Sequence, residues 1–253
     1  MIFQNVVQLV QDASVFADSK ELREEVSMKG EANFVTSVDI RISKFIKTGL
    51  RELDDKVGFF SEEEKGQLSD PCWILDPIDG TTNLVFGYRM SSISLGLYSK
   101  GEIKFGIVYN PFTKETFTAE KNQGSYLNGK RLCVSSRSVH DSIIEFGAGS
   151  THKKEADVNF EIAKTIFKNC LDIRRICSSA LDLCFIADAR IDGYFEKILK
   201  PWDIAAGSLI LTEAGGKITD YNGRNVQFAN ETSVIASNGV VHEFLEKTIN
   251  FNN

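Results

Sequence analysis

The sequence has no long apolar run and no excess of basic residues. No apolar stretch approaches the ~18 residues of a membrane-spanning helix. The first 14 residues lack the basic start and unbroken apolar centre of a signal peptide. Lys and Arg number 29 against 35 Asp and Glu, a formal charge of −6, which argues against a dedicated nucleic-acid binder. We therefore expect a cytoplasmic protein with neither a membrane nor a nucleic acid as its partner.

Cysteine and proline are also sparse. The five cysteines form no CxxC pair, and their odd number fits no disulfide framework. Buried or half-buried reduced thiols are therefore expected. With only four prolines and no repeat, no linker divides the chain, and 253 residues with 42% hydrophobic content suffice for one compact domain with a substantial core.

The first half of the chain, residues 1–137, predicts two helices beside an antiparallel sheet. Helical spacing of apolar residues predicts a first helix at Phe3, Val6, Val7, Val10, Ala13 and Phe16. A second helix should begin near 36–37 and bury Ile42, Phe45, Ile46, Leu50 and Leu53. Strands are expected at 57–60, 73–75, 92–98, 103–109 and 116–119, and Asn128-Gly129 favours a hairpin turn.

The second half, residues 138–253, alternates strands and helices. Strands are expected at 143–146, 173–176, 193–196, 217–221 and 233–236. Helices are expected at 156–170, 178–189 and 202–214, and after Gly239. Such alternation predicts a layered α/β region. The whole chain therefore reads as two sheets between helix layers, with a soft boundary near 135–142.

The most informative segment runs from Trp73 to Asn83. An apolar strand leads into Asp76, Pro77 ends the ladder, and Asp79 follows three residues later, so one strand end carries both carboxylates. The backbone N–H groups of Gly80, Thr81 and Thr82 would then open the next segment, an arrangement that suits a phosphate. The same residue types also form ordinary turns and helix caps, so the local pattern leaves both interpretations open.

Two further acids extend this pattern. Glu62 follows an apolar strand, where a solvated charge run is the alternative, and Asp203 opens a helix, where an N-cap role is the alternative. If these acids converge with Asp76 and Asp79, each like-charged pair at ~4 Å costs about 4 kcal/mol at an effective dielectric of ~20. Cations would relieve this repulsion, and oxygen-only ligands favour Mg²⁺ or Mn²⁺.

Three histidines lie outside every motif and are taken as surface or structural residues: His140, His152 and His242.

Together these segments resemble the paired signatures of the inositol monophosphatase family. The first signature is Asp76-Pro-Ile-Asp-Gly-Thr-Thr-Asn83, and the second is Trp202-Asp-Ile-Ala-Ala-Gly207 followed by Glu213-Ala-Gly-Gly. The resemblance covers nearly the whole chain. Supporting segments agree in order and spacing: Lys29 to Asp39, Ser61-Glu-Glu63, Arg174 to Asp182, and Asp192-Gly-Tyr-Phe-Glu196.

The resemblance implies a layered αβαβα sandwich of the sugar phosphatase type and a set of site residues. Up to three Mg²⁺ ions would be held by Glu62, Asp76, the backbone carbonyl of Ile78, Asp79 and Asp203. Glu62 and Thr81 would orient and activate a water held by the metal, and the backbone of Gly80, Thr81 and Thr82 would hold the phosphate. The substrate hydroxyls would face Cys177, Ser178, Ser179 and Glu196, with Asp79 and Asp203 nearby. Lithium sensitivity and a homodimer are further implications.

Three positions depart from the family pattern. Ser61 replaces a usual glycine, Asn33 stands where an acid is common, and Cys177 stands where the family often has glycine. A side chain at Cys177 could narrow the substrate pocket and change sugar specificity. The alternative for Cys177 is a buried structural thiol.

The leading functional hypothesis is a Mg²⁺-dependent phosphatase of inositol 1-phosphate. Glu196 favours it, because a carboxylate accepts hydrogen bonds from vicinal hydroxyls. Fructose 1,6-bisphosphate and 3′(2′),5′-bisphosphate nucleotides are alternative substrates, although the nucleotide branch usually lacks an acid at the Glu196 position. A third hypothesis is a binding role with the transcription or translation machinery, as a bacterial family member with similar segments has, and Arg174-Arg175 could belong to such a surface.

Overall fold

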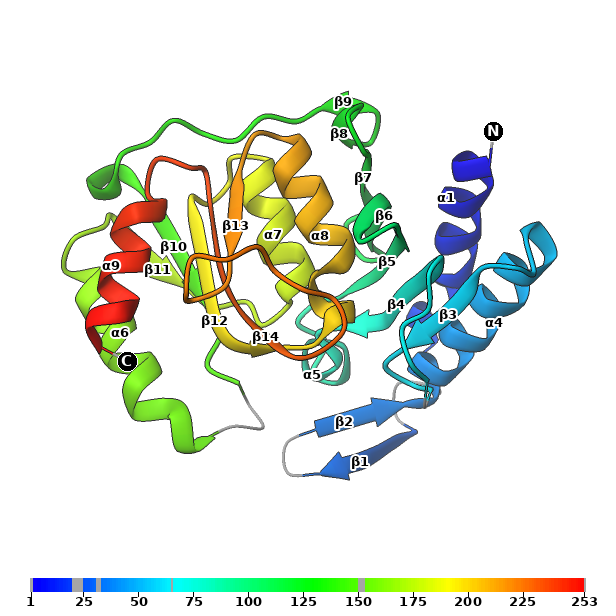
Figure 1. Cartoon of the computed structure of the whole chain (residues 1–253). Coiled ribbons are helices and arrows are strands. Elements are labelled where there is room, and N and C mark those ends of the chain that lie inside the picture. The colour runs from blue at the N-terminus through cyan, green and yellow to red at the C-terminus, as the bar shows by residue number, and fades with distance from the viewer. Residues whose placement is uncertain (1, 20–24, 31–32, 65, 150–152, 253) are drawn as a thin grey trace.

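The computed structural model describes residues 2–19, 25–30, 33–64, 66–149 and 153–252. Helices and sheets alternate in five layers, with α1 and α4 outside one sheet, α7 and α8 between the sheets, and α6 and α9 outside the other (Figure 1). This confirms the predicted αβαβα sandwich. Within the described residues, none of the helices has the length and apolar character that a bilayer crossing requires.

The first half of the chain builds the outer helices and the larger sheet. Its helices are α1 (Ile2–Ala13), α2 (Val15–Asp18), α4 (Ser37–Leu53) and the short α5 (Thr81–Val85). A two-stranded ribbon pairs β1 (Val26–Gly30) with β2 (Asn33–Thr36). The seven-stranded sheet follows chain order: β3 (Gly58–Ser61), β4 (Cys72–Asp79), β5 (Ser92–Ser99), β6 (Glu102–Asn110), β7 (Glu115–Glu120), β8 (Gly124–Leu127) and β9 (Lys130–Arg131). It is antiparallel as predicted except for β3, which pairs with β4 in parallel.

The second half forms a five-stranded sheet of order β11-β10-β12-β14-β13. The strands are β10 (Ile143–Phe146), β11 (Asp172–Arg174), β12 (Gly193–Leu199), β13 (Lys217–Thr219) and β14 (Thr232–Ser237). The helices are α6 (Ala156–Phe167), α7 (Ser179–Ala187), α8 (Pro201–Glu213) and α9 (His242–Asn252). Strand β10 runs parallel to both of its neighbours, whereas β14 is antiparallel to β12 and β13.

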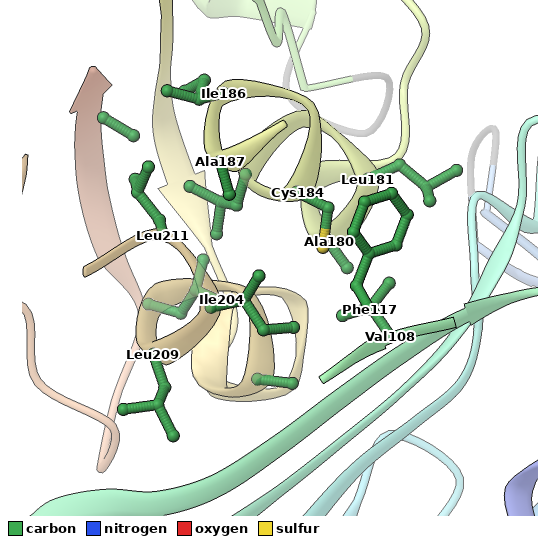
Figure 2. Packing of buried hydrophobic residues seen from close by; sticks show 14 of the residues in the cluster. Val108, Phe117, Ala180, Leu181, Cys184, Ile186, Ala187, Ile204, Leu209 and Leu211 are labelled. Carbon is green, nitrogen blue, oxygen red and sulfur yellow. The ribbon is translucent and has the colours of Figure 1, made fainter. Parts of the chain in front are cut away.

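The central layer of α7 and α8 is mostly apolar because a sheet covers each face. Every residue of α7 is buried. Figure 2 shows Ala180 and Cys184 of α7 beside Val108 and Phe117 of the larger sheet, whereas Leu209 and Leu211 of α8 lie on the side away from them. Glycine permits the closest approach: a Cβ on Gly106 would lie 2.8 Å from the carbonyl oxygen of Ala206. This contact holds α8 tightly against the larger sheet.

Two groups of side chains lie elsewhere than predicted. On α4, Ile42, Ile46 and Leu50 are buried, but Phe45 and Leu53 are 39% and 38% exposed. Both follow a buried residue by three positions and therefore lie at the flank of the apolar stripe. Among the cysteines, Cys72 and Cys184 are buried and Cys170 is half-buried, but Cys133 and Cys177 are exposed, so the expectation of buried thiols was wrong for these two.

His242 is a buried structural residue at the start of α9. Its Nδ1 lies 2.9 Å from the hydroxyl of Ser237 and its Nε2 lies 3.1 Å from the hydroxyl of Thr219. Burial lowers the pKa of His242 to about 4, assisted by Lys217 and opposed by Glu246. His140 is exposed, and His152 lies outside the described residues.

We expect this histidine to make the fold acid-sensitive. Because the folded state holds His242 neutral, only the unfolded state gains a proton as the pH falls from about 6.5 to about 4. The free energy of unfolding should therefore fall by about 3 kcal/mol over that window from this group alone. Urea unfolding at both pH values should show a smaller loss in His242→Gln than in the wild type. His140→Gln is the matched control, and an unchanged pH dependence in His242→Gln would contradict the assignment.

Candidate functional site

Two buried carboxylates and one half-buried carboxylate meet at the end of β4. One oxygen atom from each of Asp76, Asp79 and Asp203 lies within 4.8 Å of the other two. Asp76 and Asp79 come from β4, every residue of which is buried, and Asp203 comes from the first turn of α8. Three acids that the sequence analysis singled out therefore lie together, although 124 residues (203 − 79) separate Asp203 from the nearest of the others.

Local backbone geometry places each of these acids. The amide of Ile78 donates to Asp76 at 3.0 Å, which curls the chain after Pro77. Gly80 follows with a φ of +84°, where a Cβ would lie 2.9 Å from the carbonyl oxygen of Met90, so glycine is required there. On α8, Pro201 occupies the first turn and the amide of Lys200 donates to Asp203 at 2.7 Å, which holds the Asp203 side chain at the start of the helix.

Burial and mutual repulsion dominate the electrostatics of this group. The pKa of Asp76 is raised well above its ordinary value by burial and by the charges of Glu62, Asp79 and Asp203. Burial and Asp79 likewise raise the pKa of Asp203. Each like-charged pair at this spacing costs about 3 kcal/mol at an effective dielectric of ~20. The site is therefore strained electrostatically until a cation or protons compensate it.

Asp79 also connects β4 to the first turn of α7. Its Oδ2 accepts a hydrogen bond from the Ser178 hydroxyl at 2.5 Å and another from the Ala180 amide at 2.9 Å. These bonds oppose the effect of burial, and the pKa of Asp79 is raised to about 6. Because two donors already bond to Oδ2, Oδ1 is the oxygen of Asp79 that remains to act with Asp76 and Asp203.

Asp39 is a site residue that sequence reasoning did not single out. It is 1% exposed in the first turn of α4, where its Oδ2 accepts from both the amide and the hydroxyl of Thr36. Its Oδ1 accepts from the Thr81 hydroxyl at 3.2 Å, and the same hydroxyl lies 3.0 Å from the Ile78 carbonyl oxygen. Burial raises the pKa of Asp39 to about 6. The Thr36 to Asp39 spacing was visible in the sequence, but it indicates a helix cap and not a contact 42 residues away.

Glu196 is held on the other side of the site by a network of hydroxyls. Its Oε2 accepts from Tyr194 at 2.5 Å and lies 3.4 Å from the Ser179 hydroxyl, while its Oε1 accepts from the Gly149 amide at 3.1 Å. Burial raises its pKa, and Tyr194 and Arg175 act in the opposite direction. Tyr194 is the second functional residue that the sequence did not reveal, because its position inside β12 indicates only a core residue.

The segment from 176 to 179 lies between Asp79 and Glu196. Asn83 on α5 donates to the carbonyl oxygens of Ile176 and Met90, at 2.7 Å each, and so fixes this segment against the Gly80 turn. Cys177 has a φ of +62°, which explains why glycine suits this position, and its side chain is exposed. It is therefore not the buried structural thiol of the alternative interpretation.

The remaining predicted site residues lie around this centre. Glu62 lies in the turn after β3, half-buried, and its charge acts on Asp76 and Asp203. Thr82 is exposed in the first turn of α5. Ser178 and Ser179 are both buried, and their hydroxyls point to Asp79 and to the Tyr194–Glu196 pair respectively.

The cluster formed by Asp76, Asp79 and Asp203 fits a hard divalent cation. Its three ligand atoms are all oxygens, they are close enough to share one ion, and their repulsion would be relieved by positive charge. Histidine and cysteine, which zinc sites prefer, are absent from this group within the described residues. The donor set therefore matches Mg²⁺ or Mn²⁺ chemistry.

The chain is similar to known proteins over nearly its full length. The model of the inositol monophosphatase family matches residues 3–253. The chain is 35% identical over 240 residues to Nus factor SuhB of Pasteurella multocida, covering 92% of this chain and 90% of that protein. It is 36% identical over 231 residues to inositol-1-monophosphatase of Mesorhizobium japonicum, with coverages of 89% and 86%. The crystal structure of extragenic suppressor protein suhB from Bartonella henselae superimposes with a TM-score of 0.92 at 34% identity, covering 98% of each chain.

Proposed function

The chain belongs to the inositol monophosphatase family, and we propose that it is a Mg²⁺-dependent phosphomonoesterase that hydrolyses inositol 1-phosphate to inositol and phosphate. The observation that carries this proposal is the group of Asp76, Asp79 and Asp203 between two distinct polar arms. The Asp39–Thr81 pair forms one arm and Glu196 forms the other. The first arm suits a water nucleophile, and the second suits a hydroxylated leaving group.

Metal binding is assigned to the acids at the end of β4. Asp76, Asp79 and Asp203 would hold the ion or ions, and Glu62 and the Ile78 carbonyl would be further ligands. When bound, Mg²⁺ would neutralise charge on the phosphate and on the departing alkoxide and would lower the pKa of the attacking water. We propose up to three such ions, with Mn²⁺ as a substitute.

Thr81 would orient the attacking water. Its hydroxyl donates to Asp39 or to the Ile78 carbonyl, so its lone pairs remain available to accept a hydrogen bond from water. The carboxylates of Asp39 and Glu62 would then favour removal of the proton from that water. The backbone amides of Gly80, Thr81 and Thr82 belong to the start of α5, where amides lack intrahelical partners, and they would hold the phosphate oxygens.

Glu196 would recognise the polyol. Tyr194 and Gly149 fix its carboxylate, and lone pairs beyond those bonds can accept from vicinal hydroxyls. Cys177, exposed beside it, would contact the same part of the substrate and narrow its choice. We propose that 1–137 and 138–253 act as two subdomains of one phosphatase domain, the first supplying most metal ligands and the second completing the site.

A substrate panel tests this function. Purified protein should release phosphate from inositol 1-phosphate with Mg²⁺ and should lose that activity in EDTA. Fructose 1,6-bisphosphate and adenosine 3′,5′-bisphosphate are the comparison substrates, and lithium is added in a second series. Higher kcat/KM on either comparison substrate would replace the proposed substrate, and no phosphate release from any of them would refute the enzymatic proposal.

A regulatory binding role is the second candidate, favoured by the similarity to proteins named Nus factor SuhB. The exposed Arg174 and Arg175 lie on the segment that leads to α7 and could contribute to such a surface. Capture of RNA polymerase or ribosomal components by the Asp79→Asn variant, and its loss in an Arg174→Ala/Arg175→Ala variant, would support this role. A homodimer is also proposed, and light scattering measures it directly.

A further inference from the structure

A second pair of buried acids lies behind the site. Glu145 on β10 and Asp182 on α7 are only 3% and 2% exposed, although neither belongs to the carboxylate group of Asp76, Asp79 and Asp203. The two side chains lie close enough that hydrogen bonding to Glu145 helps to raise the pKa of Asp182. Two ionised carboxylates cannot form a hydrogen bond with each other, since both offer only acceptors.

Two buried oxygens without a hydrogen-bond donor indicate that a proton lies between these acids. Glu145 Oε2 and Asp182 Oδ1 are fully buried and have no hydrogen-bond donor among the described residues. One proton shared by the two carboxyl groups supplies the donor that both oxygens need. Arg174, the register neighbour of Glu145 on β11, does not neutralise the pair, because its guanidinium contacts Asp172 and the Ile173 carbonyl.

The pair is linked to Glu196 through α7 and β12. Asp182 follows Ser179 by three residues, so both lie on the same side of α7. Glu145 lies in register with Tyr194 on the neighbouring strand, so their side chains leave the same face of the sheet. Ser179 and Tyr194 bond to each other at 3.0 Å, and both contact Glu196 Oε2.

We propose that Glu145 and Asp182 share one proton and that this pair positions Glu196 through Ser179 and Tyr194. The pair joins the first turn of α7 to β10, and this turn holds one of the hydroxyls that contact Glu196. Glu196 thereby keeps a fixed orientation toward the polyol. This inference rests on the proposed function only for the role of Glu196, since the shared proton follows from the contacts alone.

The charges around the pair favour retention of that proton. Burial, the bond to Glu145, and the charges of Glu145, Asp79 and Glu196 all raise the pKa of Asp182 well above its ordinary value. Tyr194 is the other titratable group facing Asp182, and burial with Glu196 and Asp182 raises its pKa, so it remains a neutral donor.

Infrared spectroscopy of the Mg²⁺-loaded protein at pH 7 tests the proton directly. The wild type should show the C=O stretching band of a protonated carboxyl group that is absent from both Asp182→Asn and Glu145→Gln. Each amide supplies the missing donor, so both variants should fold. The shared proton would be refuted if neither variant lacks a protonated-carboxyl band that the wild type shows. This result would hold whatever substrate the enzyme hydrolyses.

Kinetics test the positioning role on the best hydroxylated substrate of the panel. In Asp182→Ala, which leaves Glu145 without a donor, KM should rise about tenfold while kcat changes by less than about threefold. Asp182→Asn should restore KM. For p-nitrophenyl phosphate, whose leaving group has no hydroxyls for Glu196, KM should stay unchanged in both variants. Asp188→Ala, at the C-cap that follows α7, is the matched control.

Two results would overturn the positioning role. The first is an equal KM increase for both substrates, which would indicate general damage to the site. The second is an unchanged KM for the polyol phosphate in Asp182→Ala. Absence of wild-type activity on every polyol phosphate would instead refute the proposed function, and the infrared result would still decide the shared proton.

Discussion

Substitution of Asp79 by asparagine is expected to lower kcat/KM by at least about a thousandfold, the loss that follows when several kcal/mol of charge stabilisation are removed. The reason lies in how Asp79 divides its two oxygens. The Ser178 hydroxyl and the Ala180 amide both donate to Oδ2. An asparagine must keep its single oxygen there, so its NH₂ group would point toward the other carboxylates. A donor then replaces a ligand at the centre of the metal site.

Metal binding and stability distinguish this explanation from unfolding. In metal-free wild type, the pKa of Asp79 is raised from 3.8 to about 6, so its contribution to stability is present below about 3.8 and is lost as the pH rises through about 6. Asparagine does not ionise, so the variant does not lose stability as the pH rises. Metal-free Asp79→Asn should therefore have a melting temperature at or above that of the wild type at pH 7.5. Mg²⁺ should raise the melting temperature of the wild type only. Asp55→Asn, at an exposed position, is the control, and wild-type turnover in Asp79→Asn would sink the metal-site proposal.

Local rules predicted two sheets between helix layers and placed Asp76 and Asp79 at one strand end, whereas the resemblance to the family implied that Glu62 and Asp203 join them. The expected end of the strand at Pro77 was wrong, because β4 continues to Asp79 with a register shift between Asp76 and Asp79. Helix α8 does begin at Pro201, and an acid follows each of these prolines two residues later. Helix and strand periodicity then placed most of the elements. Only the packing of α8 onto the larger sheet could show that Asp203 reaches Asp76 and Asp79.

Other contacts could not be read from local patterns because they depend on which face of an element meets which neighbour. Asp39 satisfies a helix cap with one oxygen and contacts Thr81 with the other, and the sequence reports only the first role. Glu145 lies in a strand whose other residues are apolar, and nothing nearby indicates that Asp182 lies opposite. Phe45 and Leu53 fit the helical pattern, yet they lie at the flank of the apolar stripe of α4 and stay partly exposed.

The second large effect concerns the pair formed by Thr81 and Asp39. Thr81→Ala should lower kcat about a hundredfold, within the range lost when one group that positions a proton transfer is removed. Asp39→Asn should cost a similar factor, because an amide at this position can no longer both accept from Thr36 and remain a charged acceptor for Thr81. KM should change little in either variant, since neither side chain is proposed to contact the polyol.

The double variant decides whether the two residues act as one unit. If Asp39 acts only by orienting the Thr81 hydroxyl, the combined Asp39→Asn and Thr81→Ala substitutions should lower kcat little more than either one alone. Multiplied losses, near ten-thousandfold, would show two independent contributions and would contradict the pairing. Thr81→Ser is the matched variant that keeps the hydroxyl, and it should recover most of the activity. Melting temperatures separate this result from damage to the α4 cap, because Asp39→Asn affects that cap and Thr81→Ala does not.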